Sequence, residues 1–526
     1  RAFCLSRGLG DVYKRQFFHH VLKAVRRGAK LVVVDPRRTV SAQWADTWLG
    51  LNVGTDIALS NAMAHEILER GLEHRAFIEN ATVGFDAYRE SVARYSADDA
   101  AAVTGIPAEA TRRIAIEYAQ AERAMICWTL GITEHHNAVD NVFALINLGL
   151  LTGHVGRYGS GLNPLRGQNN VQGGGDMGAI PDRLPGFQDV RDEAARGKFE
   201  KAWGATIPPA RGKRLNEMFD AVERGEMRAL YVVGENPLVS EADRHRTEGL
   251  LKKLDHLVVQ DVTLSQTAEL ADVVLPAAAG WCESEGTVTN SERRVQRVRK
   301  IVDPPGQARD DIDIVWSIAR RMGASWPRPT AQSLWDELRS LSPMHAGMSY
   351  PRLEQMNGLR WPCYDEQHPG ELFLHARLWE TPARGPLAPF NVVVQEPPVD
   401  AVTVEFPILL TTGRRLDSFN TGVQSGEFES PLRVRGSWID VSPEDASTLG
   451  VSDGEEVDVS SRRGSIRVRL NVDPSMRPGM AFLAFHYEAP VNLLTIDATD
   501  PKSGTAEFKA SAVRIDKVGA QAHAGD

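Results

Sequence analysis

Long apolar runs are missing from this sequence. No stretch reaches the roughly 18 consecutive apolar residues that a helix needs to cross a bilayer, which argues against a membrane-spanning segment. Net positive charge is missing as well, because the chain carries a formal charge of −9 and has a pI near 5.9. Nucleic acid and anionic lipid are therefore poor candidates for its main partner. The basic run at 293–300 alternates with apolar residues, which is typical of a strand with solvated charges or phosphate contacts.

Cysteine is scarce, with four in 526 residues. The four stand far apart, and none forms the Cys-x-x-Cys spacing that holds zinc or an iron–sulfur cluster. We therefore expect no metal ligand set in this chain. Free thiols fit a reducing compartment such as the cytoplasm. The cysteines are Cys4, Cys127, Cys282 and Cys363.

The chain has the composition of a globular enzyme, with 42% hydrophobic and 25% charged residues, and it is too long for a single core. Short β-branched runs alternate with helix-length spacers in two regions, which predicts two α/β domains with buried parallel strands. Helices are expected at 17–27 and 141–152. The β-branched runs are Leu31–Val34, Ala124–Trp128, Ala229–Val233, Leu257–Asp261 and Ala271–Pro276.

The last third of the chain has a different pattern. A Pro-rich stretch at 381–405 indicates a linker. Beyond it, short strands at close spacing with Asp-Gly and Arg-Gly turns predict a small β-barrel. The expected barrel strands are 439–442, 456–460, 465–470 and 480–485.

Residues 161–178 (GLNPLRGQNNVQGGGDMG) combine glycines, side-chain amides and one arginine. The run is too irregular for a helix interior or a strand, so we expect a loop that binds a ligand. Glycine lets the backbone approach a ligand closely, and amides offer both donors and acceptors. The planar guanidinium of Arg166 matches a carboxylate in a bidentate manner. A polar surface turn or a structural ion pair is the alternative.

Polar residues also follow several predicted strands. Asp35 and Arg37 end the first, Gly54 and Asp56 open the helix after the next turn, and Gly131 follows the strand at 124–128. Nucleotides bind at the carboxyl ends of strands in open α/β sheets. An Asp at a helix start can also pair with the N1–H and N2–H₂ groups of guanine. Ordinary strand-end turns and helix caps are the competing interpretation.

Two adjacent histidines, His135 and His136, invite a metal-site hypothesis. Neighbouring side chains on a helix diverge by roughly 100°, so one ion is a poor fit for both. A helix entry that lines a ligand pocket is the favoured interpretation.

Taken in order, these motifs resemble the molybdenum- or tungsten-dependent formate dehydrogenases, a branch of the molybdopterin oxidoreductases. The resemblance runs from Lys30 to Lys509 and includes ESEGTVTN at 283–290. It implies two Rossmann-like three-layer α/β/α domains related by pseudo-symmetry and a C-terminal double-psi β-barrel. The expected segments are a non-native leader at 1–16, guanine dinucleotide-binding α/β domains at 17–167 and 168–385, a linker at 386–404 and the barrel at 405–520.

The resemblance further implies a bis-molybdopterin guanine dinucleotide cofactor with molybdenum or tungsten. Arg166 would anchor formate, and Gln168, Asn169 and Asn170 would orient neighbouring groups. The sequence motifs that match cofactor contacts are Asp35, Arg37, Gly54, Asp56, Gly131, Gly234, Glu235, Asn236, Gln260, Asp261, Thr289, Asn290, Thr412, Gly413, Arg414, Thr421, Asn492 and Lys509.

The implied reaction is oxidation of formate to carbon dioxide, with electrons passing to iron–sulfur or flavin/NAD-type partner subunits. The alternatives are another molybdopterin oxidoreductase, such as a nitrate reductase, and a pterin-free structural subunit like that of respiratory complex I. In related enzymes an upstream portion carries a [4Fe–4S] cluster and the Cys or selenocysteine metal ligand. We expect this chain to lack that portion, to hold no metal ligand and to be inactive alone. A cytoplasmic location is expected, with the periplasm left open.

Overall fold

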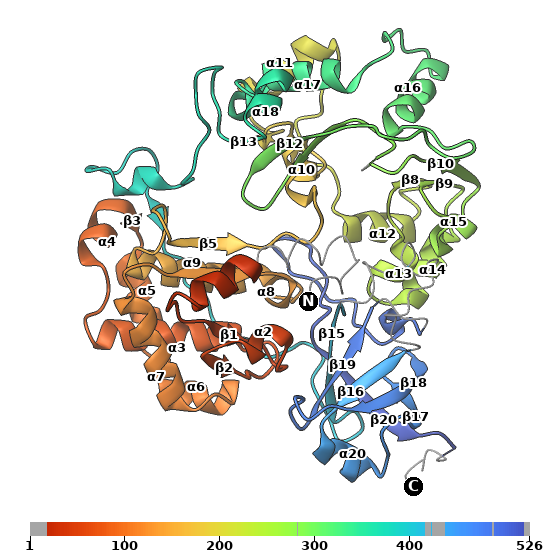
Figure 1. Cartoon of the computed structure of the whole chain (residues 1–526). Coiled ribbons are helices and arrows are strands. Elements are labelled where there is room, and N and C mark those ends of the chain that lie inside the picture. The colour runs from red at the N-terminus through yellow and green to blue at the C-terminus, as the bar shows by residue number, and fades with distance from the viewer. Residues whose placement is uncertain (1–17, 281, 416–421, 423–436, 486–488, 520–526) are drawn as a thin grey trace. The chain divides into compact units, whose positions relative to one another are not determined.

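The computed structural model describes residues 18–280, 282–415, 422, 437–485 and 489–519. Two compact units divide the chain (Figure 1). Unit 1 comprises Arg1–Leu165, Ser240–His245 and His375–Asp526, and unit 2 comprises Arg166–Val239 and Arg246–Leu374. Unit 1 thus contains the first α/β region together with the C-terminal strands, whereas unit 2 begins at the arginine of the glycine- and amide-rich run.

The α/β part of unit 1 is built on two short parallel strand pairs. β1 (Val32–Val34) pairs with β2 (Thr47–Leu49), and β4 (Met125–Trp128) pairs with β5 (Gly161–Pro164). Leu, Ile and aromatic side chains from the surrounding helices form the main core of this part. The other elements here are a helix at 18–25, α2 (Val40–Gln43), α3 (Asp56–Glu69), α4 (Arg75–Ala81), β3 (Thr82–Val83), α5 (Phe85–Val92), α6 (Ala97–Thr104), α7 (Ala108–Gln120), α8 (Leu130–Thr133) and α9 (Ala138–Thr152).

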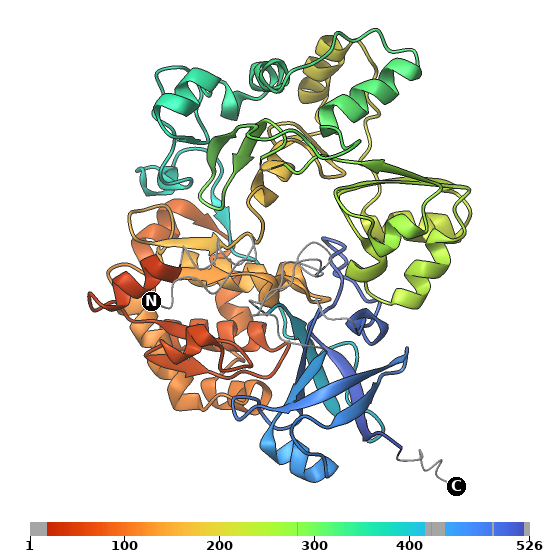
Figure 2. The same cartoon turned by 45° about the vertical axis from the view of Figure 1, so that its right-hand side comes forward.

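The C-terminal strands of unit 1 close into a six-stranded barrel, which confirms the predicted barrel. The strand order is β15-β19-β16-β18-β17-β20, and the blue strands of Figure 2 show the barrel turned forward. Alternate residues of β18 are buried, and these apolar side chains fill the barrel interior. The elements are β15 (Ile408–Gly413), β16 (Trp438–Val441), α20 (Pro443–Leu449), β17 (Glu456–Ser460), β18 (Ser465–Val472), β19 (Met480–Ala484), η3 (Val491–Leu493) and β20 (Ser511–Lys517).

The segment expected as a linker packs along unit 1. η2 (Ala376–Trp379) precedes it, and β14 (Ala388–Pro389), which lies within it, pairs with β3. The ring of Phe390 stacks on Tyr88 with 4.9 Å between centroids, and Val393 is buried. Gln395 donates to the carbonyl of Gly54 (2.7 Å) and accepts from Ala58 N (3.1 Å). The segment thereby holds the first turn of α3 instead of crossing solvent.

Unit 2 contains a second parallel sheet. β8 (Ala229–Val233), β9 (His256–Asp261) and β10 (Val273–Pro276) lie in the order β10-β9-β8. Leu257 and Val259 of β9 pack into an apolar core with residues of the neighbouring helices. These helices are α12 (Leu215–Glu223), α13 (Pro237–Ser240), α14 (Arg244–Leu251) and α15 (Gln266–Glu269). The sequence-predicted strands of this region are confirmed.

An antiparallel sheet forms the other half of unit 2. β11 (Gly286–Thr289) pairs with β12 (Arg294–Val298), which pairs with β13 (Leu359–Arg360). β12 confirms the strand pattern of the basic run. The remaining elements of unit 2 are α10 (Val171–Asp176), β6 (Arg183–Leu184), β7 (Gln188–Asp189), α11 (Glu193–Trp203), α16 (Asp311–Arg321), α17 (Ala331–Leu341), η1 (Pro343–His345) and α18 (Tyr350–Gln355).

The glycine- and amide-rich run is more regular than expected. Its first residues form β5 and its last form α10, so only the middle is a loop, and the prediction that the whole run is irregular is wrong. One glycine of α10, Gly173, is required for a steric reason. A Cβ on Gly173 would collide with Asn170 Oδ1, which accepts a hydrogen bond from Thr289 N (2.9 Å).

Adjacent glycines in α10 provide a test of this packing. Gly173→Ala should displace the Asn170 amide and strand the Thr289 N–H, which costs about 1–3 kcal/mol. Gly174 has open space around its Cβ position, so Gly174→Ala should be neutral or stabilising by about 0.5–1 kcal/mol. Thermal unfolding of both variants decides the matter, and equal effects would refute the steric role of Gly173.

Candidate functional site

The carboxyl end of β1 carries the first predicted site residues. Asp35 Oδ1 accepts a hydrogen bond from Arg37 N (2.8 Å), which turns the chain at the end of the strand. The Arg37 guanidinium lies over the ring of Phe482 in the barrel, 3.5 Å from its centroid. Burial raises the pKa of Asp35, opposed by the hydrogen bond and charge of Arg37. The strand end therefore faces the barrel within unit 1.

Asp56, the first residue of α3, holds the second predicted carboxylate. Burial raises its pKa, while the nearby charge of His135 lowers it and that of Asp35 raises it further. Asp35 and Asp56 are thus close enough to interact. Among the described residues, no other residue donates a hydrogen bond to the Asp56 carboxylate. A half-buried carboxylate with free acceptor capacity fits a ligand with N–H donors, such as guanine.

Glu507 joins the barrel side of unit 1 to the turn after α8. Its fully buried carboxylate accepts hydrogen bonds from His136 N (3.0 Å) and from Lys509 N (3.0 Å) and Ala510 N (3.1 Å). The ring nitrogens His135 Nδ1 and His136 Nδ1 lie 3.3 and 3.2 Å from Glu507 Oε2. Burial works to raise the pKa of Glu507, but these hydrogen bonds hold it well below its usual range.

His135 is a buried cation. Its Nδ1 faces the Glu507 carboxylate and its Nε2 lies 3.1 Å from the Gly131 carbonyl, so both ring nitrogens face acceptors and both must carry hydrogen. Burial works to lower the pKa of His135, but the hydrogen bond and charge of Glu507 raise it. The two histidines lie in a turn between α8 and α9, so the predicted divergence of their side chains is wrong: both reach one carboxylate.

Lys509 extends this charged cluster. Its ammonium donates to the Thr412 carbonyl (2.9 Å) and lies 2.6 Å from Glu134 Oε2. The Thr412 hydroxyl donates to the Phe508 carbonyl (2.6 Å), so β15 and the approach to β20 are fixed against each other. The sequence motifs at Thr412 and Lys509 therefore lie together with the predicted Asp35 and Asp56 in unit 1.

The other predicted residues of unit 1 have backbone or packing roles. Gly54 adopts a φ of 75° just before α3, which only glycine adopts readily. Gly413 accepts a hydrogen bond from Phe485 N (3.1 Å), and the Arg414 guanidinium lies 4.8 Å from the Phe485 ring centroid. Asn492 is buried and donates to the Glu241 carbonyl (2.8 Å). Thr421 lies outside the described residues.

The strand ends of unit 2 use several predicted side chains internally. Asn236 Oδ1 accepts from Thr267 N (3.1 Å) and its Nδ2 donates to Gln266 Oε1 (2.8 Å), which ties the end of β8 to α15. Gln260 is fully buried, accepts from the Tyr231 hydroxyl and donates to Asp311. Gly234, at φ 63°, has open space around its Cβ position. Glu235, which follows Gly234, belongs to the same group of predicted residues at the end of β8.

Asp261 ends β9. Its carboxylate accepts from Val262 N (2.6 Å), and burial raises its pKa against that hydrogen bond. The roles of Gly234, Glu235, Asn236, Gln260 and Asp261 as cofactor contacts stay predictions.

Arg166, the predicted substrate anchor, is exposed at the start of unit 2. Its backbone N–H donates to Ser291 Oγ (3.1 Å), while within the described residues its guanidinium has no hydrogen bond or ion pair. Gln168 is exposed and Asn169 half-buried. Asn290 Oδ1 accepts from Glu292 N and Arg294 N (both 3.0 Å) and closes the β11–β12 turn. The loop is thus fixed by its backbone and leaves the arginine head available.

Asp176 is a buried acid that the sequence motifs did not single out. Its side chain has no exposed surface and accepts from Gln172 Nε2 (2.9 Å) and Trp361 Nε1 (2.8 Å). Burial raises its pKa to about 6, although the hydrogen bonds and the charge of Arg166 work to lower it. Asp176, like Glu507, carried no local signal, because its partner Trp361 lies 185 residues away in the sequence.

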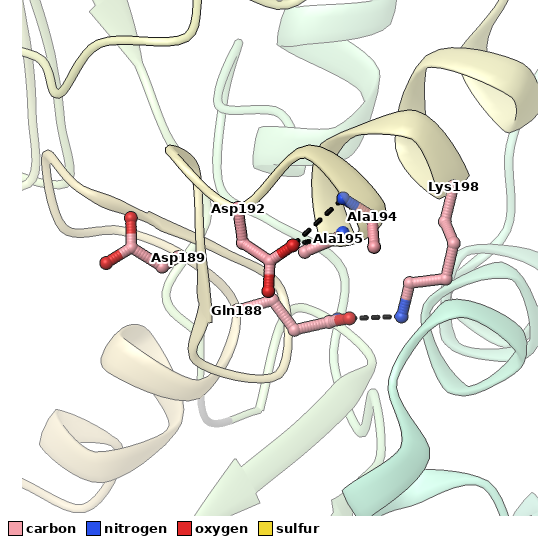
Figure 3. A pocket seen from close by; sticks show the side chains of 6 residues that line it. All are labelled: Gln188, Asp189, Asp192, Ala194, Ala195 and Lys198. Carbon is pink, nitrogen blue, oxygen red and sulfur yellow. Dashed lines mark hydrogen bonds between the residues drawn. The ribbon is translucent and has the colours of Figure 1, made fainter.

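A shallow hollow of about 370 Å³ at the start of α11 is ordinary surface. Figure 3 shows that Asp192 accepts from Ala194 N and Ala195 N and that Lys198 donates to Gln188, so these polar groups are hydrogen-bonded to one another.

In the described part of the chain, Cys127, Cys282 and Cys363 are free and no cluster of three or more His, Cys, Asp or Glu could hold a metal ion. No helix found there is long and apolar enough to span a bilayer.

Two family profiles match the chain. Residues 13–321 match "Molybdopterin oxidoreductase", and residues 408–512, which include most of the barrel, match "Molydopterin dinucleotide binding domain". The chain belongs to the molybdopterin oxidoreductase family and is an oxidoreductase with a domain for a pterin dinucleotide.

Curated relatives agree with this family. The chain is 39% identical over 506 residues to F420-dependent formate dehydrogenase subunit alpha of Methanocaldococcus jannaschii, covering 95% of this chain and 74% of that protein. It is 36% identical to formate dehydrogenase H of Escherichia coli, covering 96% and 71%. Acetylene hydratase of Pelobacter acetylenicus shares the fold, with a TM-score of 0.72 at 21% identity over 95% of this chain and 75% of that one.

Glu507→Gln should lower the free energy of unfolding by about 3 kcal/mol or more, because it leaves the His135 cation buried without its counter-charge. Because folding lowers the pKa of Glu507, its carboxylate contributes to the free energy of unfolding above pH 4.5, the ordinary pKa of Glu. This contribution is lost as the pH falls through the lowered pKa. Because folding raises the pKa of His135, its positive charge contributes to the free energy of unfolding below pH 6.5, the ordinary pKa of His. This contribution is lost as the pH rises through the raised pKa. The Tm difference from wild type should therefore be largest between these two values.

The matched control for this variant is Glu396→Gln. Glu396 is an exposed carboxylate 3.6 Å from His136 Nε2, so its neutralisation should change Tm little. A loss of stability as large as that of Glu507→Gln would show that burial is not the decisive factor.

Asp176→Asn should raise stability at neutral pH. The raised pKa means that the folded state holds its proton longer, so stability falls as the pH rises from 3.8 to about 6 and stays low above it. That difference in pKa corresponds to about 3 kcal/mol. The Tm gain over wild type should grow from pH 4 to pH 7, and Asp192→Asn on the surface serves as control. A pH-independent gain would contradict the buried charge.

Proposed function

We propose that this chain is the catalytic subunit of a formate dehydrogenase that oxidises formate to carbon dioxide at a molybdenum or tungsten bis-molybdopterin guanine dinucleotide centre. The observation that carries the proposal is Arg166: its guanidinium has no partner in the described residues, while its backbone is fixed by Ser291. The relatives named as formate dehydrogenases support the substrate.

Each unit contains residues that would suit a pterin dinucleotide. In unit 1 the Asp56 carboxylate, to which no other described residue donates a hydrogen bond, would accept from a guanine, and the buried charges around Glu507 would support the pterin. The chemistry of this donor set fits the group. In unit 2 the open space at Gly234 and the Asp261 carboxylate are suited to the second dinucleotide. When bound, the metal–pterin group supplies an acceptor for two electrons.

Arg166 would bind and orient the substrate. Its two parallel N–H groups pair with the two oxygens of formate, which fixes the plane of the molecule and the direction of its C–H bond. Oxidation breaks that bond: HCOO⁻ gives CO₂, one proton and two electrons. Gln168 and Asn169, beside Arg166 in the loop, would contact the bound anion. The electrons would leave through partner subunits of iron–sulfur or flavin/NAD type, in the cytoplasm.

In the complete, cofactor-loaded natural enzyme, Arg166→Ala should lower kcat/KM for formate roughly a hundredfold, about 3 kcal/mol, because binding and alignment are lost together. Arg166→Lys should recover only part of the loss, since a point charge cannot hold formate in a plane. The measurement is formate-dependent reduction of an artificial dye, with guanine nucleotide content determined for each preparation.

The matched control is Arg191→Ala, which removes an exposed arginine of unit 2 that pairs with Asp189. It should leave both kcat/KM and nucleotide content unchanged. If Arg166→Ala keeps normal formate kinetics, or simply loses its nucleotide, Arg166 is not the substrate anchor.

A further inference from the structure

The segment that carries Arg166 is attached to β11 and to the turn that follows this strand. At its start, Arg166 N donates to Ser291 Oγ (3.1 Å). In the middle, Asn170 Oδ1 accepts from Thr289 N (2.9 Å). Two hydrogen bonds therefore hold residues 166–170 against the β11–β12 hairpin.

Asp176 ends α10 and is fully enclosed. Each carboxylate oxygen accepts from a different side chain: Oδ1 from Gln172 within α10, and Oδ2 from Trp361, which follows β13. Trp361 is 8% exposed and Asp176 0%, so neither bond competes with water. The Asp176 carbonyl also accepts from Gly186 N (2.7 Å), which fixes the chain beyond α10. Asp176 therefore connects three separate segments of unit 2.

We propose that Asp176 is a positioning residue for the substrate: its buried carboxylate ties α10 to Trp361 and thereby sets where Arg166 presents its guanidinium to formate. This inference rests on the proposed function. It assigns Asp176 no contact with the substrate and no part in bond breaking. The carboxylate acts through the loop, because bidentate binding tolerates little displacement of the guanidinium.

A double-mutant cycle tests whether Asp176 acts through Arg166. In the cofactor-loaded enzyme, Asp176→Ala should lower kcat/KM for formate at least tenfold. In the Arg166→Ala background the same change should have an effect below twofold, because there is no guanidinium left to misplace. An equal loss in both backgrounds, or no loss in the first, would overturn the proposal.

Conservative changes separate positioning from folding. The Asn of Asp176→Asn can still accept from Trp361, and it can donate to Gln172 once the Gln172 amide has rotated to present its oxygen. The kcat/KM of this variant should therefore stay within threefold of wild type. Trp361→Phe removes one donor and leaves the acid, so it should reduce kcat/KM severalfold even if Asp176→Ala fails to fold. Asp192→Ala, which removes a surface carboxylate of the same unit, should have no effect. Loss in Asp176→Asn equal to that in Asp176→Ala would contradict the anchoring role.

A spectroscopic measurement provides a readout apart from turnover. The Trp361 indole N–H resonance in ¹⁵N-labelled protein, assigned with Trp361→Phe, should shift when sodium formate is added to wild type and should not shift in Arg166→Ala. A formate shift that persists in Arg166→Ala would overturn the coupling between Asp176 and the anchor. If wild type neither oxidises nor binds formate, the proposed function fails. In that case a shifted Trp361 indole N–H resonance in Asp176→Ala, measured without formate, still shows whether the Asp176–Trp361 hydrogen bond forms.

Discussion

The burial of Glu507 is the constraint on which unit 1 depends. A carboxylate without exposed surface is stable only if charged and polar partners replace water on every side, and here His135, His136 and two backbone N–H groups do so. Those partners come from the turn between α8 and α9 and from the segment that leads into β20. The same charge balance therefore fixes the barrel against the first α/β region and keeps His135 a cation.

The polar side chains of the described residues divide into two kinds. Some polar side chains at strand ends satisfy one another, as Gln260 and Asn236 do in unit 2. Others, above all Asp56 and Arg166, keep capacity that no other described residue uses. A half-buried group with spare acceptors, such as Asp56, costs free energy unless a ligand completes it, whereas the exposed Arg166 is hydrated until an anion binds. This difference separates groups that support the site from groups that are available to bind.

The segment around Arg166 is ordered before any ligand binds. A flexible glycine-rich loop could present an arginine only at an entropic cost. The structure instead places β5 before Arg166 and α10 after it, and Gly173 of α10 admits the Asn170 side chain. The arginine is thus exposed on a segment whose backbone is already ordered, which lowers the cost of binding an anion.

Local pattern determined much of this protein. Four of the six barrel strands, the three strands of the unit 2 sheet and α9 follow from residue periodicity and turn residues within a few positions, as does the choice of Asp35, Asp56 and Arg166 as candidates, whereas β15 and β20 had no such local pattern. Only the tertiary structure decided the rest. Glu507 meets His135 across 372 residues and Trp361 meets Asp176 across 185, and no local signal encodes such pairs. The helical form of 171–176 was also invisible, because glycine disfavours a helix unless, as at Gly173, packing leaves no room for a side chain.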